Sequence, residues 1–139
     1  MPRLAVVIVS WNVRELLASC LRSLFDDLHR SRLKAVVGVV DNASTDGTPE
    51  MVGDQFPSTH LIASRENRGF AAGNNLALEE ILRRSEFAVP SSYIWLLNPD
   101  TEVRPGATAV LLSALESNPA VGVAGAKLLY RDGSLQQGA

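Results

Sequence analysis

The chain contains only one cysteine, Cys20, and two histidines, His29 and His60. One cysteine excludes an internal disulfide bond and any zinc site built from a cysteine cluster. No histidine has a sensible spacing from Cys20, and no Ser-His-Asp or Cys-His arrangement can be assembled. Cys20 is therefore interpreted as a core thiol and the histidines as solvated or structural. So little cysteine is consistent with a reducing cytosol.

Long apolar runs and an excess of one charge are also missing. No stretch approaches the roughly 20 apolar residues of a membrane span, and the run at residues 4–9 is too short for the core of a signal peptide. Thirteen basic and fifteen acidic residues give a net charge of −2, which provides no general attraction to nucleic acid or to an anionic membrane. The G-x-G-x-x-G and P-loop motifs are absent from the sequence. Any anion site must therefore be local.

Strand and helix patterns alternate along the chain. Continuous apolar runs are typical of parallel strands that are buried on both faces. The expected strands lie at residues 4–9, 36–40, 60–63, 93–97 and 121–125, and the expected helices at 12–28, 48–56, 70–84 and 105–117, with a loop at 86–92 and an Asp-Gly hairpin turn at 131–134. This order predicts a three-layer α/β/α fold with a mostly parallel sheet. Residues 1–139 suffice for one domain, and the ending at 135–139 indicates truncation at the C-terminus.

Local signals predict how the helices begin and which side faces the core. Asn12, followed three residues later by Glu15, is typical of a capping box, and Pro49 suits the first turn of a helix that starts at Thr48. Trp11 can flank a ligand's base, but a partly buried core position is favoured. The residues expected to face the core are Leu17, Cys20, Leu21, Leu24 and Leu28 in the first helix and Leu76, Ile81 and Leu82 in the third.

Polar segments lie at the carboxyl ends of the expected strands. They are residues 10–12 (Ser-Trp-Asn), 41–48 (Asp-Asn-Ala-Ser-Thr-Asp-Gly-Thr), 67–75 (Asn-Arg-Gly-Phe-Ala-Ala-Gly-Asn-Asn) and 98–101 (Asn-Pro-Asp-Thr). In open parallel sheets, ligands bind outside these ends of the strands. Ser10 and Asn12 are expected to lie close to any such ligand. The composition of the four segments indicates a phosphorylated ligand that carries a metal ion.

Asp100 is the candidate metal ligand. Mg²⁺ prefers oxygen donors and usually takes only one or two carboxylates together with substrate phosphates, which suits a single carboxylate delivered by a buried strand. The alternative is that Asn-Pro-Asp serves only as a turn. Asn98 is the weaker candidate, because a neutral amide binds a hard cation less well than a carboxylate does.

Two further segments offer contacts to a nucleotide. Asp41 can accept a hydrogen bond from the ring N–H of uracil or thymine, whereas Asp46 is assigned to local capping. Asn67, Arg68 and Gly69 precede a helix, whose N-terminal N–H groups and dipole favour an anion. The alternative for that segment is a surface turn with glycines that serve helix packing.

The polar segments resemble the signature blocks of family 2 glycosyltransferases, and especially those of bacterial rhamnosyltransferase-like members. The matching residues are 9–12, 41–47, 67–75 and 97–101, in this order along the whole chain. Four motifs at the right separations rarely coincide, so the resemblance is specific. It implies a GT-A fold, a nucleotide-diphosphate sugar donor and a divalent metal ion, Mg²⁺ or Mn²⁺.

The same resemblance implies roles for individual residues. Asp41 contacts the base with Ser10 beside it, residues 67–69 lie near the donor, and Asp100 stands in the aspartate-x-aspartate metal motif. Asn98 replaces the first aspartate of that motif, which is a departure from the strict pattern.

The implied reaction is inverting transfer from dTDP-rhamnose or a UDP-sugar to a glycan or lipid-linked acceptor. It needs a carboxylate base, which the family carries beyond the point where this chain stops, and Asp132 is assigned to a turn. We therefore expect donor binding with little or no turnover. The implied location is cytoplasmic, peripheral at the inner face of the membrane, without a nucleic-acid partner.

Two other functions stay open on sequence alone. A sugar nucleotidyltransferase needs a glycine-rich, basic loop after its first strand, where this chain has Ser-Trp-Asn-Val-Arg at residues 10–14. A non-catalytic nucleotide-sugar-binding or scaffold domain keeps the fold without metal chemistry, and a substitution of Asp100 distinguishes it from an enzyme.

Overall fold

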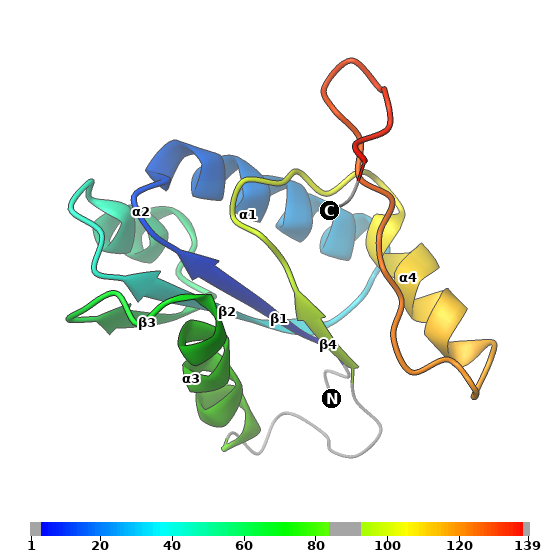
Figure 1. Cartoon of the computed structure of the whole chain (residues 1–139), viewed down its shortest axis with the longest axis horizontal. Coiled ribbons are helices and arrows are strands. Elements are labelled where there is room, and N and C mark those ends of the chain that lie inside the picture. Colours follow the sequence, from blue (N-terminus) through cyan, green and yellow to red (C-terminus); the bar gives the residue numbers. More distant parts are fainter. Residues whose placement is uncertain (1–3, 84–92, 138–139) are drawn as a thin grey trace.

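The computed structural model describes residues 4–83 and 93–137. In chain order, its elements are β1 (Leu4–Ser10), α1 (Arg14–Arg30), β2 (Ala35–Asn42), α2 (Thr48–Gln55), β3 (His60–Ser64), α3 (Phe70–Leu82), β4 (Tyr93–Leu96) and α4 (Ala107–Glu116) (Figure 1). These elements agree with the expected ones to within two residues at each end. The loop expected at 86–92 lies outside the described residues.

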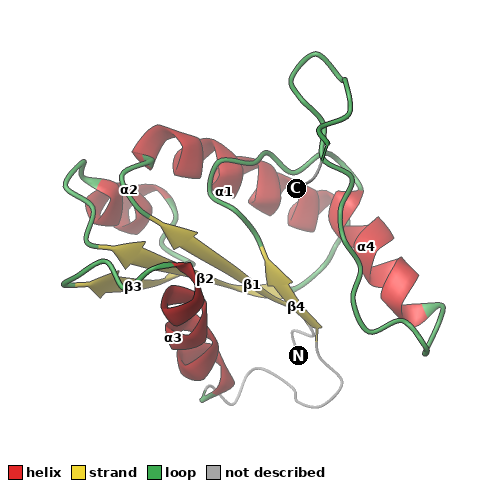
Figure 2. Cartoon of the chain, viewed as in Figure 1, coloured by secondary structure: helices red, strands yellow, loops and turns green. Residues whose placement is uncertain are grey.

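The strands form one parallel sheet in the order β3-β2-β1-β4. Residues Leu4 to Ser10 of β1 pair with residues Ala35 to Asp41 of β2, and Val7 pairs with Leu96 of β4. Because every strand runs in the same direction, all the carboxyl ends meet at one edge of the sheet (Figure 2). The polar segments that follow the strands therefore gather there.

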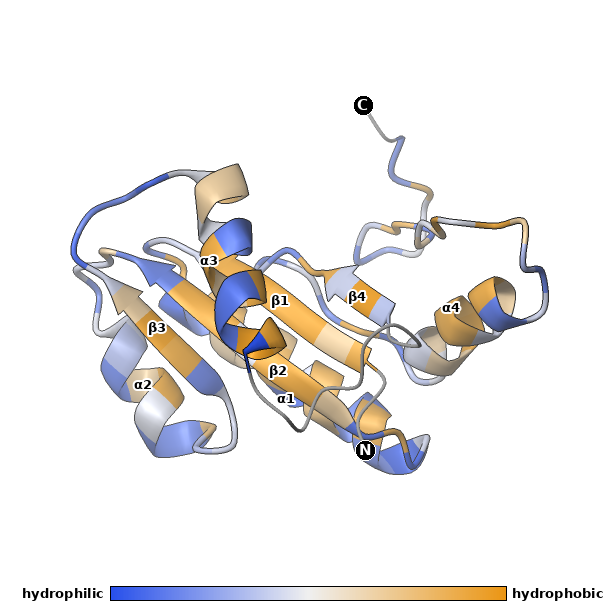
Figure 3. Cartoon of the chain, turned by 90° about the horizontal axis from the view of Figure 1, so that it is seen from below, coloured by the Kyte–Doolittle hydropathy of each residue, from blue (hydrophilic) through white to orange (hydrophobic). Residues whose placement is uncertain are grey.

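Helices cover both faces of the sheet, as predicted. Val6 and Ile8 of β1 belong to a buried cluster with residues of α1 and α2, whereas Val7 and Val9 belong to a second cluster with Ala77 and Ile81 of α3. Figure 1 shows α1 and α3 on opposite sides of the sheet, and Figure 3 shows that β1 is hydrophobic along most of its length. The five residues of α1 that were expected to face the core are all buried.

Close packing of α3 on the sheet depends on glycine. A Cβ atom at Gly73 would lie 2.8 Å from Val9 Cγ1, closer than Cβ atoms approach other side chains, and 3.1 Å from Val9 Cγ2. On the sheet side, a Cβ atom at Gly38 would lie 3.1 Å from Ile81 Cδ1. Gly73 therefore serves helix packing, which was one of the two interpretations of the glycines in this segment.

The expectations for residues 121–125 and for Leu82 are wrong, whereas the expected hairpin is confirmed. Residues 121–125 form no strand, and Val123 is 88% exposed, because no described strand lies beside them to accept their backbone hydrogen bonds. Leu82, the last residue of α3, is 49% exposed, whereas Ile81 is 1% exposed and packs next to Gly38 of β2. The hairpin is confirmed: Leu129 and Leu135 form an antiparallel bridge, and Asp132 accepts hydrogen bonds from Ser134 within the turn.

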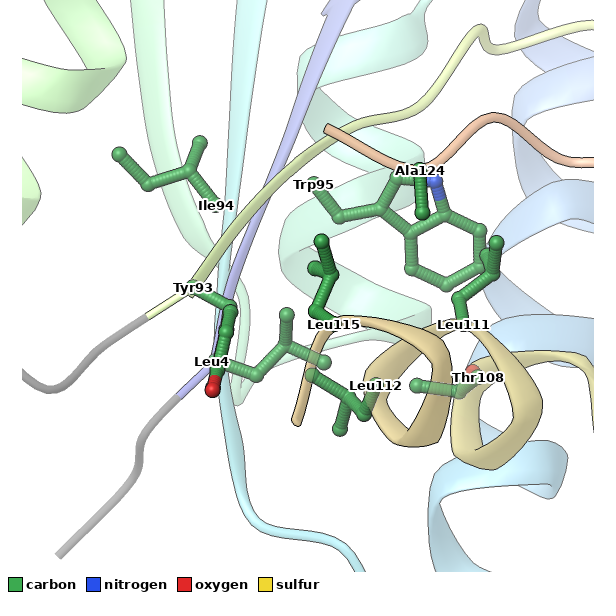
Figure 4. A pocket seen from close by; sticks show the side chains of 9 residues that line it. All are labelled: Leu4, Tyr93, Ile94, Trp95, Thr108, Leu111, Leu112, Leu115 and Ala124. Atoms are coloured by element: carbon green, nitrogen blue, oxygen red, sulfur yellow. The ribbon is translucent and has the colours of Figure 1, made fainter. Parts of the chain in front are cut away.

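A small apolar crevice lies between β4 and α4. Figure 4 shows that Trp95, Leu112 and Leu115 point into it and that Ala124 approaches from the segment after α4. No charged side chain lines it, so it is a packing contact and not the polar site. No helix within residues 4–83 and 93–137 has the length and apolar character needed to cross a bilayer.

Candidate functional site

Ser10 and Asp41 lie side by side where β1 and β2 end. They are register partners, and each is 1% exposed. The carboxylate of Asp41 accepts hydrogen bonds from the backbone N–H (3.0 Å) and the hydroxyl (2.5 Å) of Ser44. Because a carboxylate has about four acceptor positions, these two hydrogen bonds leave acceptor capacity on Asp41, although the residue is almost fully covered in this structure.

The hydroxyl of Ser10 is buried without a hydrogen-bond partner among the described residues. An unsatisfied buried polar group costs about 1–3 kcal/mol. A ligand group or an ordered water that reached Ser10 Oγ would recover this energy.

Asn12 joins the loop after β1 to the loop after β2. Its Oδ1 accepts a hydrogen bond from the Thr45 N–H (2.8 Å), and its own N–H donates to Ser44 Oγ (2.9 Å). Its φ of +51° lies in the left-handed region, which asparagine tolerates better than most residues. The predicted capping box is therefore wrong: α1 begins at Arg14, Val13 is at the N-cap, and Val13 makes no side-chain capping bond.

The first N–H group of α1 is satisfied by Asp46, 32 residues along the chain. Asp46 accepts hydrogen bonds from the Arg14 N–H (3.0 Å) and, at the start of α2, from the N–H (3.2 Å) and hydroxyl of Thr48. The Thr48 hydroxyl lowers the pKa of Asp46, burial opposes this effect, and the Arg14 N–H reinforces it. The capping assignment of Asp46 is confirmed, and it extends to both helices.

Asp46→Ala is expected to destabilise the fold by about 2 kcal/mol, because each lost helix cap costs about 1 kcal/mol. Urea denaturation measures this, with Asp54→Ala, an exposed carboxylate on α2, as the control that should change stability little. The pKa of Asp46 is lowered in the folded state, so its contribution is present above the unfolded pKa of about 3.9. It is lost as the pH falls through the folded pKa, and the difference between wild type and Asp46→Ala should shrink there.

The N-terminus of α3 is tied to the end of β2. Asn67 Oδ1 accepts a hydrogen bond from the Gly69 N–H (2.9 Å), and Asn42 Nδ2 donates to the Gly69 carbonyl (3.1 Å). Gly69 has a φ of +83°, which glycine adopts without strain. The first turn of α3 contains no acidic residue, so its N–H groups suit an anion. Exposed Arg68 pairs with Glu66 at 3.4 Å.

Asp100 lies in a turn directly after β4. The Leu97 N–H donates to the Val7 carbonyl (3.0 Å), which continues the pairing with β1, and the Thr101 hydroxyl donates to the Asn98 carbonyl (2.8 Å). The side chains of Asn98 and Asp100 are exposed. The turn interpretation is thus correct for the backbone, and it is compatible with the metal interpretation because the turn exposes the carboxylate at the sheet edge.

Sequence reasoning missed the contact between α1 and the loop after β4. Cys20 Sγ donates to the Asn98 carbonyl (3.6 Å), Ser23 Oγ accepts from the Val103 N–H (2.9 Å), and Asp27 accepts from the N–H groups of Gly106 (2.6 Å) and Thr108 (3.0 Å). The available signal was an acidic residue at position 27, on the apolar stripe of α1.

Burial and local charge set the protonation of these groups. Burial raises the pKa of Cys20 to about 11, a hydrogen bond with Thr101 acts in the opposite direction, and the charges of Asp100 and Glu102 add to the increase. The thiol is therefore neutral at pH 7, as a core cysteine should be. Burial also favours the neutral form of Asp27, but the hydrogen bonds from Thr108 and Gly106 outweigh it and leave the pKa of Asp27 lowered.

The position of Trp11 corrects a prediction. It is 55% exposed and not part of the core, because the chain leaves the sheet at Ser10 and turns at Asn12 before α1 can cover the indole. The exposed ring therefore follows directly after the end of β1, at the edge of the sheet that carries Asp41.

The described residues can contribute to a metal site but cannot enclose one. Within residues 4–83 and 93–137, no group of three or more histidine, cysteine, aspartate or glutamate residues is placed to hold a metal ion. A cation that takes most of its ligands from phosphate oxygens needs only one or two carboxylates. The exposed carboxylate of Asp100, with the amide of Asn98 nearby in the turn, fits such a cation.

Solved structures share this architecture. A mannosyltransferase from Pyrobaculum calidifontis, solved with GDP-Man and Mn²⁺, is 26% identical over 87% of this chain and 34% of its own, with a TM-score of 0.67. S. aureus TarS (residues 1–349) in complex with UDP-GlcNAc is 20% identical over 84% of this chain and 32% of its own, with a TM-score of 0.64, and this second likeness concerns the fold alone.

Sequence similarity gives the family. An N-acetylglucosaminyl-diphospho-decaprenol L-rhamnosyltransferase from Mycobacterium tuberculosis is 30% identical over 103 residues, which are 70% of this chain and 33% of that protein. The chain thus spans about a third of the length of the relatives that it matches. The model of the family described as "Glycosyl transferase family 2" matches residues 5–138. The chain, with its GT-A-like α/β fold, therefore belongs to glycosyl transferase family 2.

Proposed function

We propose that this chain binds the nucleotide-diphosphate sugar and the divalent metal ion of a glycosyltransferase at the carboxyl edge of its sheet. The observation that carries the proposal is the register of the strands. It puts Ser10 beside Asp41, and the pairing of β4 with β1 leads directly into the turn that exposes Asp100. A base-binding carboxylate and a metal-binding carboxylate thus follow β2 and β4, the two strands on either side of β1, at one edge of the sheet.

Each part of the donor has a candidate partner. The base meets Asp41 and Ser10, and the Ser10 hydroxyl has no hydrogen-bond partner among the described residues. The exposed indole of Trp11 is available to flank the ring of the base. The diphosphate lies near Arg68 and the N–H groups at the start of α3. Asn12, Asn67 and Gly69 shape the loops around it through the hydrogen bonds described above.

Asp100 would hold the metal ion, with Asn98 as a weaker ligand. The metal would supply positive charge for the diphosphate leaving group when the sugar is transferred. Inverting transfer also requires a carboxylate that removes the proton from the acceptor hydroxyl. Asp132 accepts hydrogen bonds from Ser134 within its turn, so we do not assign it as that base.

The donor is proposed to be dTDP-rhamnose or a UDP-sugar, and the acceptor a glycan or a lipid-linked sugar. The similarity to a rhamnosyltransferase that acts on N-acetylglucosaminyl-diphospho-decaprenol supports this choice. A protein with such an acceptor would work in the cytoplasm at the inner face of the membrane.

Calorimetric titration with UDP, dTDP and GDP, each in Mn²⁺ and then in EDTA, tests the proposal. We expect at least one diphosphate to bind in Mn²⁺ about tenfold or more tightly than in EDTA, a difference of about 1.4 kcal/mol. The preferred base then narrows the class of sugar. Equal binding in Mn²⁺ and EDTA, or no binding by a chain shown to be folded by circular dichroism, would contradict the proposal.

A further inference from the structure

We propose that Asp27 is a positioning residue that holds the Asp100 turn in the geometry needed to bind the metal ion. This inference rests on the proposed function, because it concerns the same metal ligand. Asp27 is a buried group on α1 that does not touch the metal ion itself and acts on the site through the backbone of the loop after β4.

The loop that carries Asp100 is held on both sides by one face of α1. On the N-terminal side, the Asn98 carbonyl accepts hydrogen bonds from Cys20 Sγ (3.6 Å) and the Thr101 hydroxyl (2.8 Å). On the C-terminal side, Ser23 accepts the Val103 N–H at 2.9 Å. Residues 20, 23 and 27 lie three and four positions apart, which places them on the same side of a helix.

Asp27 makes the strongest of these contacts. It is 2% exposed, and its two carboxylate oxygens accept the N–H groups of Gly106 (2.6 Å) and Thr108 (3.0 Å). Hydrogen bonds to a charged group are about twice as strong as neutral ones, and a buried carboxylate is costly unless it is bonded in this way. Asp27 therefore fixes where the loop ends and where α4 begins.

This arrangement matters for Asp100 because the turn itself is exposed. An exposed carboxylate on an unrestrained loop would lose conformational freedom when it binds a metal ion, which weakens the affinity. A turn held between fixed points avoids that loss. Groups that orient metal ligands without touching the metal typically change the affinity for metal about 10- to 100-fold when they are substituted.

The test compares Asp27→Asn with Asp26→Asn, the neighbouring exposed carboxylate on the same helix. Both changes remove one negative charge, but only the first removes an oxygen that accepts a loop N–H. Binding of UDP, dTDP and GDP is measured by calorimetry in Mn²⁺ and in EDTA, well below the melting temperature. We expect Asp27→Asn to weaken Mn²⁺-dependent binding about 10- to 100-fold, with binding in EDTA unchanged, and Asp26→Asn to match the wild type.

The comparison with Asp100→Ala separates the two proposals. If Asp100→Ala removes Mn²⁺-dependent binding but Asp27→Asn only lowers the melting temperature, the positioning role is wrong and the metal site stands. If Asp100→Ala changes nothing, both are wrong. Should Asp27→Asn fail to fold, Asp27→Glu takes its place, since it keeps the charge but displaces the carboxylate oxygens that accept the Gly106 and Thr108 N–H groups. A wild-type Mn²⁺ response in folded Asp27→Glu would then overturn the inference.

Discussion

Asp100→Ala is expected to reduce the affinity for a nucleoside diphosphate in Mn²⁺ at least about a hundredfold, a loss of about 2.8 kcal/mol. Removing a direct metal ligand should exceed the effect of removing a group that only orients one. Within residues 4–83 and 93–137, no cluster of other ligands is available to hold the ion instead. Calorimetric titration in Mn²⁺ and in EDTA measures the effect, and binding in EDTA should be unchanged.

The control is Glu102→Ala, which removes an exposed carboxylate two residues further along the same loop. If Asp100 acts as a ligand, Glu102→Ala should leave the Mn²⁺ response close to that of the wild type. Equal losses in both variants would mean that the loop attracts the cation only by its general negative charge. Neither change should alter stability by more than about 0.5 kcal/mol, because surface substitutions rarely do.

Much of the fold was predictable because it follows from short-range patterns. The continuous apolar runs of β1 and β2 require burial on both faces, and this requirement leads directly to a parallel sheet with helices on each side. Thr48 and Pro49 mark the start of α2 correctly, since proline suits the first turn of a helix. The residues of α1 that face the core follow from helical spacing alone.

The contacts that shape the candidate site could not be predicted in the same way. Asp46 caps α1 from 32 positions away, and Asp27 holds the start of α4 from 79 and 81 positions away. A local motif such as the expected capping box at Asn12 competes with these long-range acceptors, and the sequence does not reveal which one is closer in space. The charge of Asp27 on an apolar helix face was the visible sign that a buried partner existed.

The errors at Trp11 and at residues 121–125 have a common cause. Apolar character predicts burial, but burial also requires a neighbouring element that covers the side chain or pairs with the backbone. Trp11 lies beyond the end of β1, where α1 has not yet begun, and residues 121–125 have no described strand beside them. At the sheet edge, an exposed aromatic ring is consistent with contact to a ligand.

Gly73→Val is expected to destabilise the protein by about 3 kcal/mol, at the upper end of the range for overpacked cores. The new Cβ would lie 2.8 Å from Val9 Cγ1, and Val9 cannot move aside easily because β-branched side chains are stiff. α3 must then lift from β1, and the bond from Asn42 to Gly69 at its N-terminus is strained. Gly53→Val is the matched control, a helical glycine in α2 whose Cβ would meet nothing within 4 Å. Urea denaturation measures both variants. A stability for Gly73→Val equal to that of Gly53→Val would show that α3 does not pack on the sheet as closely as described.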